Sequence, residues 1–84
     1  MDAKEKYVQI LENFNSSLDY NPISSDAICL YHTIVYMFYK QNWVKTIKIS
    51  NNVLIAKTGL TLSSLQRKRN ELQQKRLHYI FKRK

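Results

Sequence analysis

The segment at residues 50–77, SNNVLIAKTGLTLSSLQRKRNELQQKRL, has the pattern of two short helices joined by a tight turn. Ser50 is a helix-capping residue type, and the helix that it begins should run through Thr58. Gly59 fits the left-handed position that ends a helix and permits a sharp turn. Thr61 then caps a second helix that we expect over residues 62–76. This arrangement is typical of a helix-turn-helix, whose second helix can lie in the major groove of DNA.

The charge of the chain is segregated in the same way as this pattern. Residues 1–44 contain three Lys and five Asp or Glu, a net charge of −2. Residues 45–84 contain eleven Lys or Arg and a single acid, Glu71, a net charge of +10. A basic half that coincides with a helix-turn-helix segment is the electrostatic footprint of a nucleic-acid binder.

The composition indicates one small helical domain spanning residues 1–84, which we expect to be an N-terminal fragment of a longer protein. Apolar residues make up 44% of the chain, enough for a packed core, while one Gly and one Pro leave little material for turns. A single Cys, no signal-peptide pattern and no apolar stretch long enough for a bilayer favour a cytoplasmic protein. No catalytic motif is evident, so we expect no enzyme and no cofactor. Cys29 and His32 share a helix face, but two ligands make no zinc site, so we expect both in the core and no metal.

Two further helices are expected in the acidic half. Apolar residues recur at helical spacing from Tyr7 to Leu18, and the pair Asn21-Pro22 ends that helix. Ser24 or Ser25 then caps a helix over about residues 26–41.

This second helix is apolar on nearly all sides, which requires cover on most of its surface. In so small a domain, we expect a partner chain to supply part of that cover, in a homodimer or a larger homo-oligomer. The residues expected at this oligomer interface are Tyr31, Val35, Phe38 and Tyr39.

Two short strands complete the prediction. The β-branched alternation of Thr46–Ile49 predicts one strand, and the alternation of Leu77–Phe81 predicts another. The order helix, helix, strand, helix, helix, strand gives a mostly α fold with a small β element, a winged helix-turn-helix. The wing is truncated, because the chain stops where its hairpin should turn.

Helical projection of residues 62–76 identifies the candidate DNA contacts. Leu62, Leu65 and Leu72 should face the core, which places Arg67 on the opposite side, where it suits a bidentate contact with guanine. The other expected DNA-binding residues are Ser63, Ser64 and Asn70 for base and phosphate contacts, Lys57 and Thr61 beside the turn, and Lys82, Arg83 and Lys84 for phosphate or the minor groove. The competing interpretation of any single cation is a merely solvated helix surface.

Two long stretches, NPISSDAICLYHTIVYMFYKQNW and ISNNVLIAKTGLTLSSLQRKRNELQQKRLHYIFKRK, carry a family resemblance. Together they resemble the N-terminal winged-helix domain of DnaD-like replication initiation proteins, the replisome organisers of low-GC Gram-positive bacteria and their phages. The most specific matches are Ile23-Ser24-Ser25, Lys57-Thr58-Gly59-Leu60 and Arg67-x-Arg69-Asn70-x-Leu72, while Lys68 and Arg76 depart from the family pattern. The resemblance implies binding of origin DNA, self-association and help in loading a replicative helicase.

Two other functions remain open for the same sequence. One is a small helix-turn-helix transcriptional regulator, which would recognise an inverted repeat with half-sites one helical turn apart. The other is a winged-helix protein-docking module, whose basic surface would serve only solubility.

Overall fold

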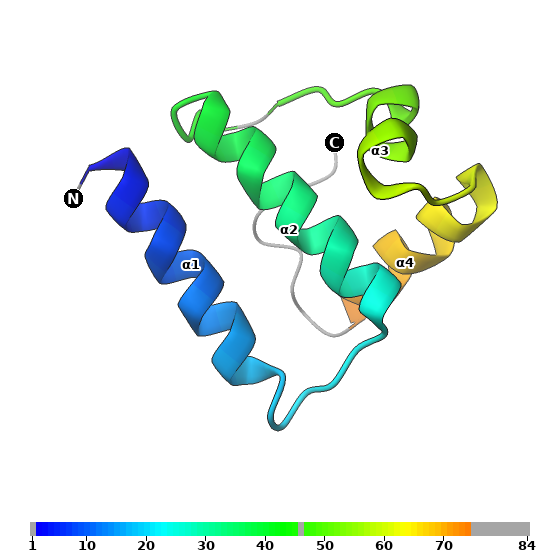
Figure 1. Ribbon diagram of the computed structural model, residues 1–84, viewed down its shortest axis with the longest axis horizontal. Helices are drawn as coiled ribbons and strands as arrows, with labels where there is room; N and C mark the ends of the chain where they lie inside the picture. Colours follow the sequence, from blue (N-terminus) through cyan, green and yellow to red (C-terminus); the bar gives the residue numbers. More distant parts are fainter. Residues whose placement is uncertain (1, 46, 75–84) are drawn as a thin grey trace.

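The computed structural model describes residues 2–45 and 47–74 of the chain and folds them into four α-helices (Figure 1). The helices are α1 (Ala3–Ser17), α2 (Ser25–Lys40), α3 (Asn51–Thr58) and α4 (Leu62–Gln74). Each lies where the sequence pattern predicts a helix, with bounds that differ by a few residues.

The predicted fold class is wrong, because residues 2–45 and 47–74 form an all-helical structure without a strand or sheet. In the expected strand Thr46–Ile49, the alternation of burial is real: Ile47 and Ile49 pack against the core and Lys48 is exposed. A strand also needs a neighbour to pair its backbone N–H and C=O groups, and no such ladder forms in the described chain. The second expected strand, Leu77–Phe81, lies outside the described residues.

Local side-chain bonds fix where α1 and α2 begin. Asp2 and Glu5 form a reciprocal capping box: the Asp2 carboxylate accepts from the Glu5 amide at 2.8 Å, and the Glu5 carboxylate accepts from the Asp2 amide at 3.1 Å. Of the two serines before α2, Ser24 is the cap, and its hydroxyl accepts from the Ala27 amide at 3.2 Å. The N-terminal ends of α1 and α2 are therefore determined by capping residues in the sequence.

The far end of α2 is tied to the beginning of α1. Asn42 and Trp43 have φ angles of +59° and +58°, in the left-handed region that non-glycine residues rarely occupy. The indole N–H of Trp43 donates to the carbonyl of Ala3 at 3.1 Å, and the Lys6 ammonium lies 5.1 Å from the centroid of the indole ring. These contacts hold the reversed backbone after α2 in place.

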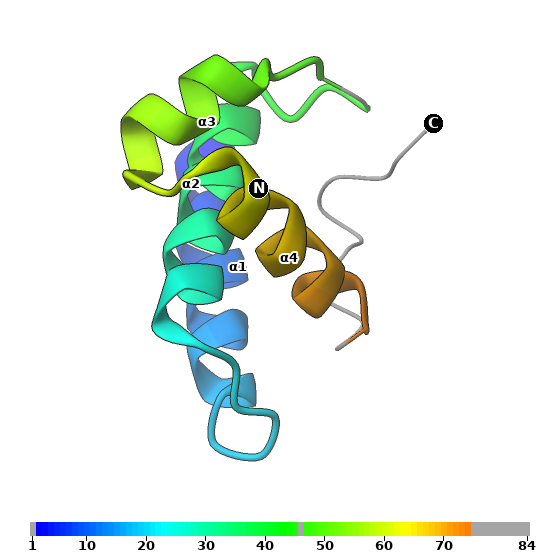
Figure 2. The same cartoon turned by 90° about the vertical axis from the view of Figure 1, so that its right-hand side faces the viewer.

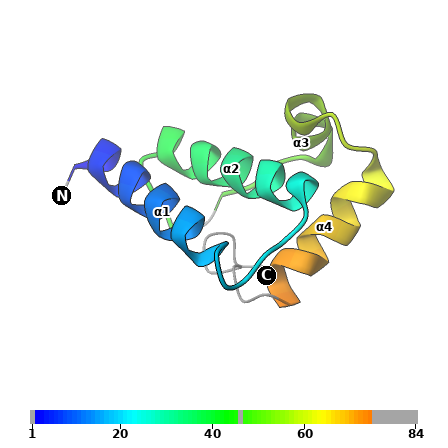
Figure 3. The ribbon, with the colours of Figure 1, turned by 60° about the horizontal axis from the view of Figure 1, so that its bottom comes forward.

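α2 is the central helix, and the other three helices pack against it. α1 lies beside α2 on one side, while α3 and α4 lie on the other side (Figures 1 and 3), and α4 crosses α2 obliquely (Figure 2). The buried core is drawn from all four helices and consists of Phe14, Ala27, Leu30, Tyr31, Ile34, Val35, Phe38, Leu54, Leu65 and Leu72. The ring of Phe14 stacks on that of Tyr31, with centroids 3.8 Å apart.

The expected oligomer interface is corrected by this packing. Tyr31 and Val35 are fully buried and Phe38 is 5% exposed, so these three side chains have no surface left for a partner. Tyr39 is half-buried and stacks on Tyr7 of α1, with ring centroids 4.7 Å apart. Helices of the same chain cover Tyr31, Val35 and Phe38, which the prediction did not take into account, while Tyr36 on the same helix is 39% exposed. Self-association stays a prediction that other residues would have to carry.

Two other expectations about α2 concern Cys29 and membrane insertion. Cys29 is exposed, so its expected place in the core is wrong, whereas His32 is half-buried with its ring edge against Phe14. None of the four helices in the described residues is both long enough and apolar enough to cross a bilayer.

The stacked pair of Phe14 and Tyr31 should contribute much of the stability of the α1–α2 packing. We expect Phe14→Ala to lower the free energy of unfolding by about 3–5 kcal/mol, because it leaves a cavity under α1. For a chain of this size, that loss approaches the whole free energy of unfolding, about 5–10 kcal/mol. Urea unfolding followed by circular dichroism measures the change. The matched control is Val8→Ala on the exposed side of α1, for which we expect less than about 0.5 kcal/mol.

Candidate nucleic-acid interface

A short turn, Gly59–Thr61, joins α3 to α4. Gly59 has φ +77°, in the left-handed region where a side chain would be strained, and its N–H donates to the carbonyl of Ile55 at 2.8 Å. The Thr58 hydroxyl donates to the carbonyl one turn earlier at 2.7 Å and accepts from the amide of Leu60 at 3.2 Å. These bonds set the angle between the two helices of the helix-turn-helix segment.

One side of α4 is buried and the other is open to solvent. Leu65 and Leu72 are fully buried, as the helical projection predicted, but Leu62 is 47% exposed, so its expected place in the core is wrong. With 3.6 residues per turn, Leu62 stands about 60° around the helix from Leu65 and about 80° from Leu72, at the edge of the buried side. The open side carries Ser63, Arg67, Asn70 and Gln74, with Ser64 half-buried at its edge.

The buried side of α4 is held to α2 by Glu71, a contact that the sequence analysis missed. One oxygen of the Glu71 carboxylate accepts from the backbone N–H of Ser24 at 2.8 Å, and the other accepts from the Ser24 hydroxyl at 3.0 Å. Ser24 is the N-cap of α2, so an acid from α4 also lies at the positive end of the α2 dipole. The signal that pointed to it was compositional: Glu71 is the single acid among residues 45–84.

The environment of Glu71 favours its charged form. The hydrogen bond from the Ser24 backbone amide lowers the pKa of the Glu71 carboxyl, and the Ser24 hydroxyl and the Lys68 charge act in the same direction against the opposing effect of burial. The Lys68 ammonium lies 3.5 Å from the nearer Glu71 oxygen, an i, i+3 pair on α4. Lys68, which the sequence left unassigned between the two sides of the helix, is thus partly neutralised.

A second contact joins α4 to the beginning of α3. Arg69 is half-buried, and its guanidinium donates to the side-chain oxygen of Asn51 at 3.4 Å. α4 is therefore held at three places: by the turn at its N-terminal end, by Glu71 to α2, and by Arg69 to α3. The open side of α4 therefore has a fixed orientation.

The first turn of α4 presents an ordered group of polar side chains. The Thr61 hydroxyl accepts from the Ser64 amide at 3.2 Å, which caps the helix, and lies 3.5 Å from the Ser63 hydroxyl. The Arg67 guanidinium donates to the Ser64 hydroxyl at 2.9 Å. Arg67 is exposed, so this bond holds its side chain near the N-terminal end of α4 and leaves other guanidinium N–H groups for a ligand.

The remaining expected contacts are only partly described. Lys57 is exposed in the last turn of α3, beside the turn to α4. Lys82, Arg83 and Lys84 lie outside the described residues, as do Lys75 and Arg76. Of the cations that the structure describes after residue 44, four are exposed (Lys45, Lys48, Lys57 and Arg67), whereas Lys68 and Arg69 are half-buried.

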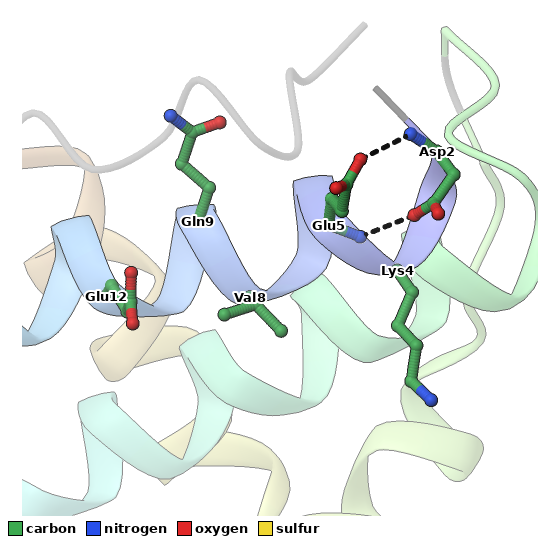
Figure 4. Close-up of a pocket in the computed structure, with 6 residues that line it drawn as sticks. All are labelled: Asp2, Lys4, Glu5, Val8, Gln9 and Glu12. Atoms are coloured by element: carbon green, nitrogen blue, oxygen red, sulfur yellow. Dashed lines mark hydrogen bonds between the residues drawn. The ribbon is translucent and has the colours of Figure 1, made fainter.

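A pocket on the outer side of α1 has the opposite character. It is an open depression of about 600 Å³, and the described residues that line it are Asp2, Lys4, Glu5, Val8, Gln9 and Glu12 (Figure 4). Three carboxylates against one ammonium make this surface unsuited to phosphate, and two of those carboxylates are already engaged in the capping box. Among the described surfaces, the exposed side of α3 and α4 is the better fit for a nucleic acid.

Comparisons with protein-family models, with curated proteins and with solved structures give no match to this chain. The resemblance to DnaD-like initiation proteins therefore stays a prediction, and DNA contact by the expected residues stays one as well.

The charged hydrogen bond from Glu71 to Ser24 predicts a pH dependence of stability. Because the pKa of Glu71 is lower in the folded chain than in the unfolded chain, its stabilising effect is present above the ordinary carboxyl pKa of about 4.3. The effect is lost as the pH falls through the folded pKa. Glu71→Gln keeps the shape but removes the charge, and we expect it to lower the free energy of unfolding at pH 7 by about 1 kcal/mol.

Urea unfolding of the parent and of Glu71→Gln between pH 7 and pH 3 measures this effect. The difference between the two proteins should shrink as the pH falls. Glu12→Gln, which removes the same charge from the exposed side of α1, is the control and should change little. A difference that stays constant down to pH 3 would show that the Glu71 charge contributes nothing to folding.

Proposed function

We propose that this chain binds duplex DNA, with α4 in the major groove and α3 against the sugar–phosphate backbone. The observation that carries the proposal is the two-sided character of α4. Its buried side is fixed to the core by Leu65, Leu72 and Glu71, while Ser63, Arg67 and Asn70 are exposed on the other side. Helix-turn-helix proteins bind DNA with a second helix supported in this way.

The charge of the chain supports the same proposal. The exposed cations Lys57 and Arg67 belong to the basic half of the chain, and the acidic surface described on α1 lies on the far side of α2 (Figure 1). This asymmetry would orient the chain with α3 and α4 toward the polyanion. We expect Lys57 to contact phosphate and Arg67 to contact a base edge.

Within DNA binding, we propose a role in the initiation of replication, which rests on the resemblance to replisome organisers. Recognition of clustered direct repeats at an origin would support that role. Recognition of an inverted repeat with half-sites one helical turn apart would instead favour a transcriptional regulator.

A second candidate function is docking onto another protein, because the exposed surface of α3 and α4 also includes the apolar side chains of Val53 and Leu62, 38% and 47% exposed. Salt separates the two candidates. DNA binding through phosphate contacts weakens steeply as salt rises, whereas apolar docking does not.

Arg67 should contribute specificity as well as affinity. We expect Arg67→Ala to weaken binding to the preferred duplex by about 1–3 kcal/mol and to relax the preference for guanine at one position. Fluorescence anisotropy with labelled duplexes measures both effects. The matched control is Lys4→Ala, which removes one positive charge from α1 and should leave the sequence preference unchanged. Equal binding of every duplex by the parent and by Arg67→Ala would exclude base reading by Arg67.

Lys57 should contribute affinity without specificity. We expect Lys57→Ala to weaken binding to all duplexes by a similar factor, because a phosphate contact carries no sequence information. It should also reduce the slope of log affinity against log salt concentration by about 1. Anisotropy titrations between about 50 and 200 mM salt measure that slope. An unchanged slope in Lys57→Ala would place Lys57 away from the phosphates.

A further inference from the structure

A ridge of four exposed side chains runs along α4 beside Arg67. Leu62, Gln66, Asn70 and Gln74 follow one another at intervals of four residues, and all four are exposed. Residues four apart lie above one another on a helix, separated by about 6 Å along its axis. The ridge therefore consists of one leucine followed by three amides.

The amides of this ridge are available to a ligand. Within residues 2–45 and 47–74, no hydrogen bond engages the side chain of Gln66, Asn70 or Gln74. The neighbouring polar groups are already occupied: Ser64 accepts from Arg67, and Glu71 accepts from Ser24. The ridge also carries no carboxylate, so it has no group that repels phosphate.

The chemistry of these side chains matches one kind of base pair. Asn and Gln form bidentate hydrogen bonds with N6 and N7 of adenine, and an exposed apolar side chain contacts the methyl group of thymine. Resting on the proposed function, we infer that the ridge reads A·T pairs. Gln66 and Asn70 each bind an adenine, Leu62 contacts a thymine methyl group, and Arg67 reads a single G·C pair among them.

The spacing of the ridge fixes the order of these contacts. The 6 Å step from Gln66 to Asn70 corresponds to roughly two base pairs at about 3.4 Å each. The two adenines should therefore lie about two pairs apart, with the Leu62 thymine on the side of Gln66 away from Asn70. Gln74 lies at the far end of α4 and receives no base in this arrangement.

Selection from a random duplex library, with the full 84-residue chain, tests the inference. The parent should enrich an A·T-rich site with one G·C pair. Asn70→Ala and Gln66→Ala should each lose the preference at one position, and these positions should lie about two pairs apart. The control is Gln9→Ala on the exposed side of α1, which should select the parent site. Circular dichroism establishes that the variants are folded.

Base analogues then test each contact in the selected site. Replacing one adenine by 7-deazaadenine removes the N7 acceptor and should weaken parent binding about tenfold, without further loss in Asn70→Ala. Replacing thymine by uracil removes the methyl group and should weaken the parent about fourfold but not Leu62→Ala.

The outcomes distinguish the inference of A·T reading from the proposed binding of duplex DNA. Enrichment of G·C-rich sites, binding without sequence preference, or losses that are additive in the variants overturn the A·T inference and leave duplex binding intact. Failure of the parent to bind any duplex at low salt overturns both.

Discussion

The burial of α2 decides which side of every other helix is open to solvent. Six residues of α2 are buried, and at 3.6 residues per turn they form one broad stripe, about 140° wide, against which α1, α3 and α4 all pack. Leu65 and Leu72 of α4 point into the core as part of this packing. Because the apolar side of α4 packs against α2, its polar side is open to solvent. The orientation of the candidate interface is therefore set by the packing of the core.

The single acid of the basic half contributes to both the core and the interface. Placed on the open side of α4, a carboxylate would repel phosphate; placed at Ser24, it caps α2 and pairs with Lys68. The negative charge therefore lies on the buried side of α4, away from its open side. The ion pair with Glu71 also partly neutralises Lys68. The open side of α4 is therefore mostly uncharged and polar, with Arg67 as its cation.

Local patterns predicted the helices, because caps such as Ser50 and the left-handed Gly59 act on their nearest neighbours. They also predicted which side of α4 holds Arg67, since projection needs only the helical repeat. Two errors have one origin: the strand at 46–49 and the buried Leu62 both depend on what lies nearby in space. The bond from Glu71 to Ser24 spans 47 residues, and no local pattern contains it.

The residues on the open side of α4 indicate how much of the proposed DNA binding would come from electrostatic attraction to phosphates and how much from hydrogen bonds to bases. Attraction to DNA scales with the number of phosphates neutralised, and the described open side of α4 supplies one cation. Lys57 adds a second from α3, so the long-range part of binding must draw largely on cations elsewhere in the basic half. What α4 itself offers is a row of amide and hydroxyl groups on a helix of fixed orientation, and such groups gain little from phosphate charge but distinguish bases by geometry. Rigid support from three sides is the property that this kind of recognition requires, because a hydrogen-bond pattern can be read only by groups whose positions are set in advance.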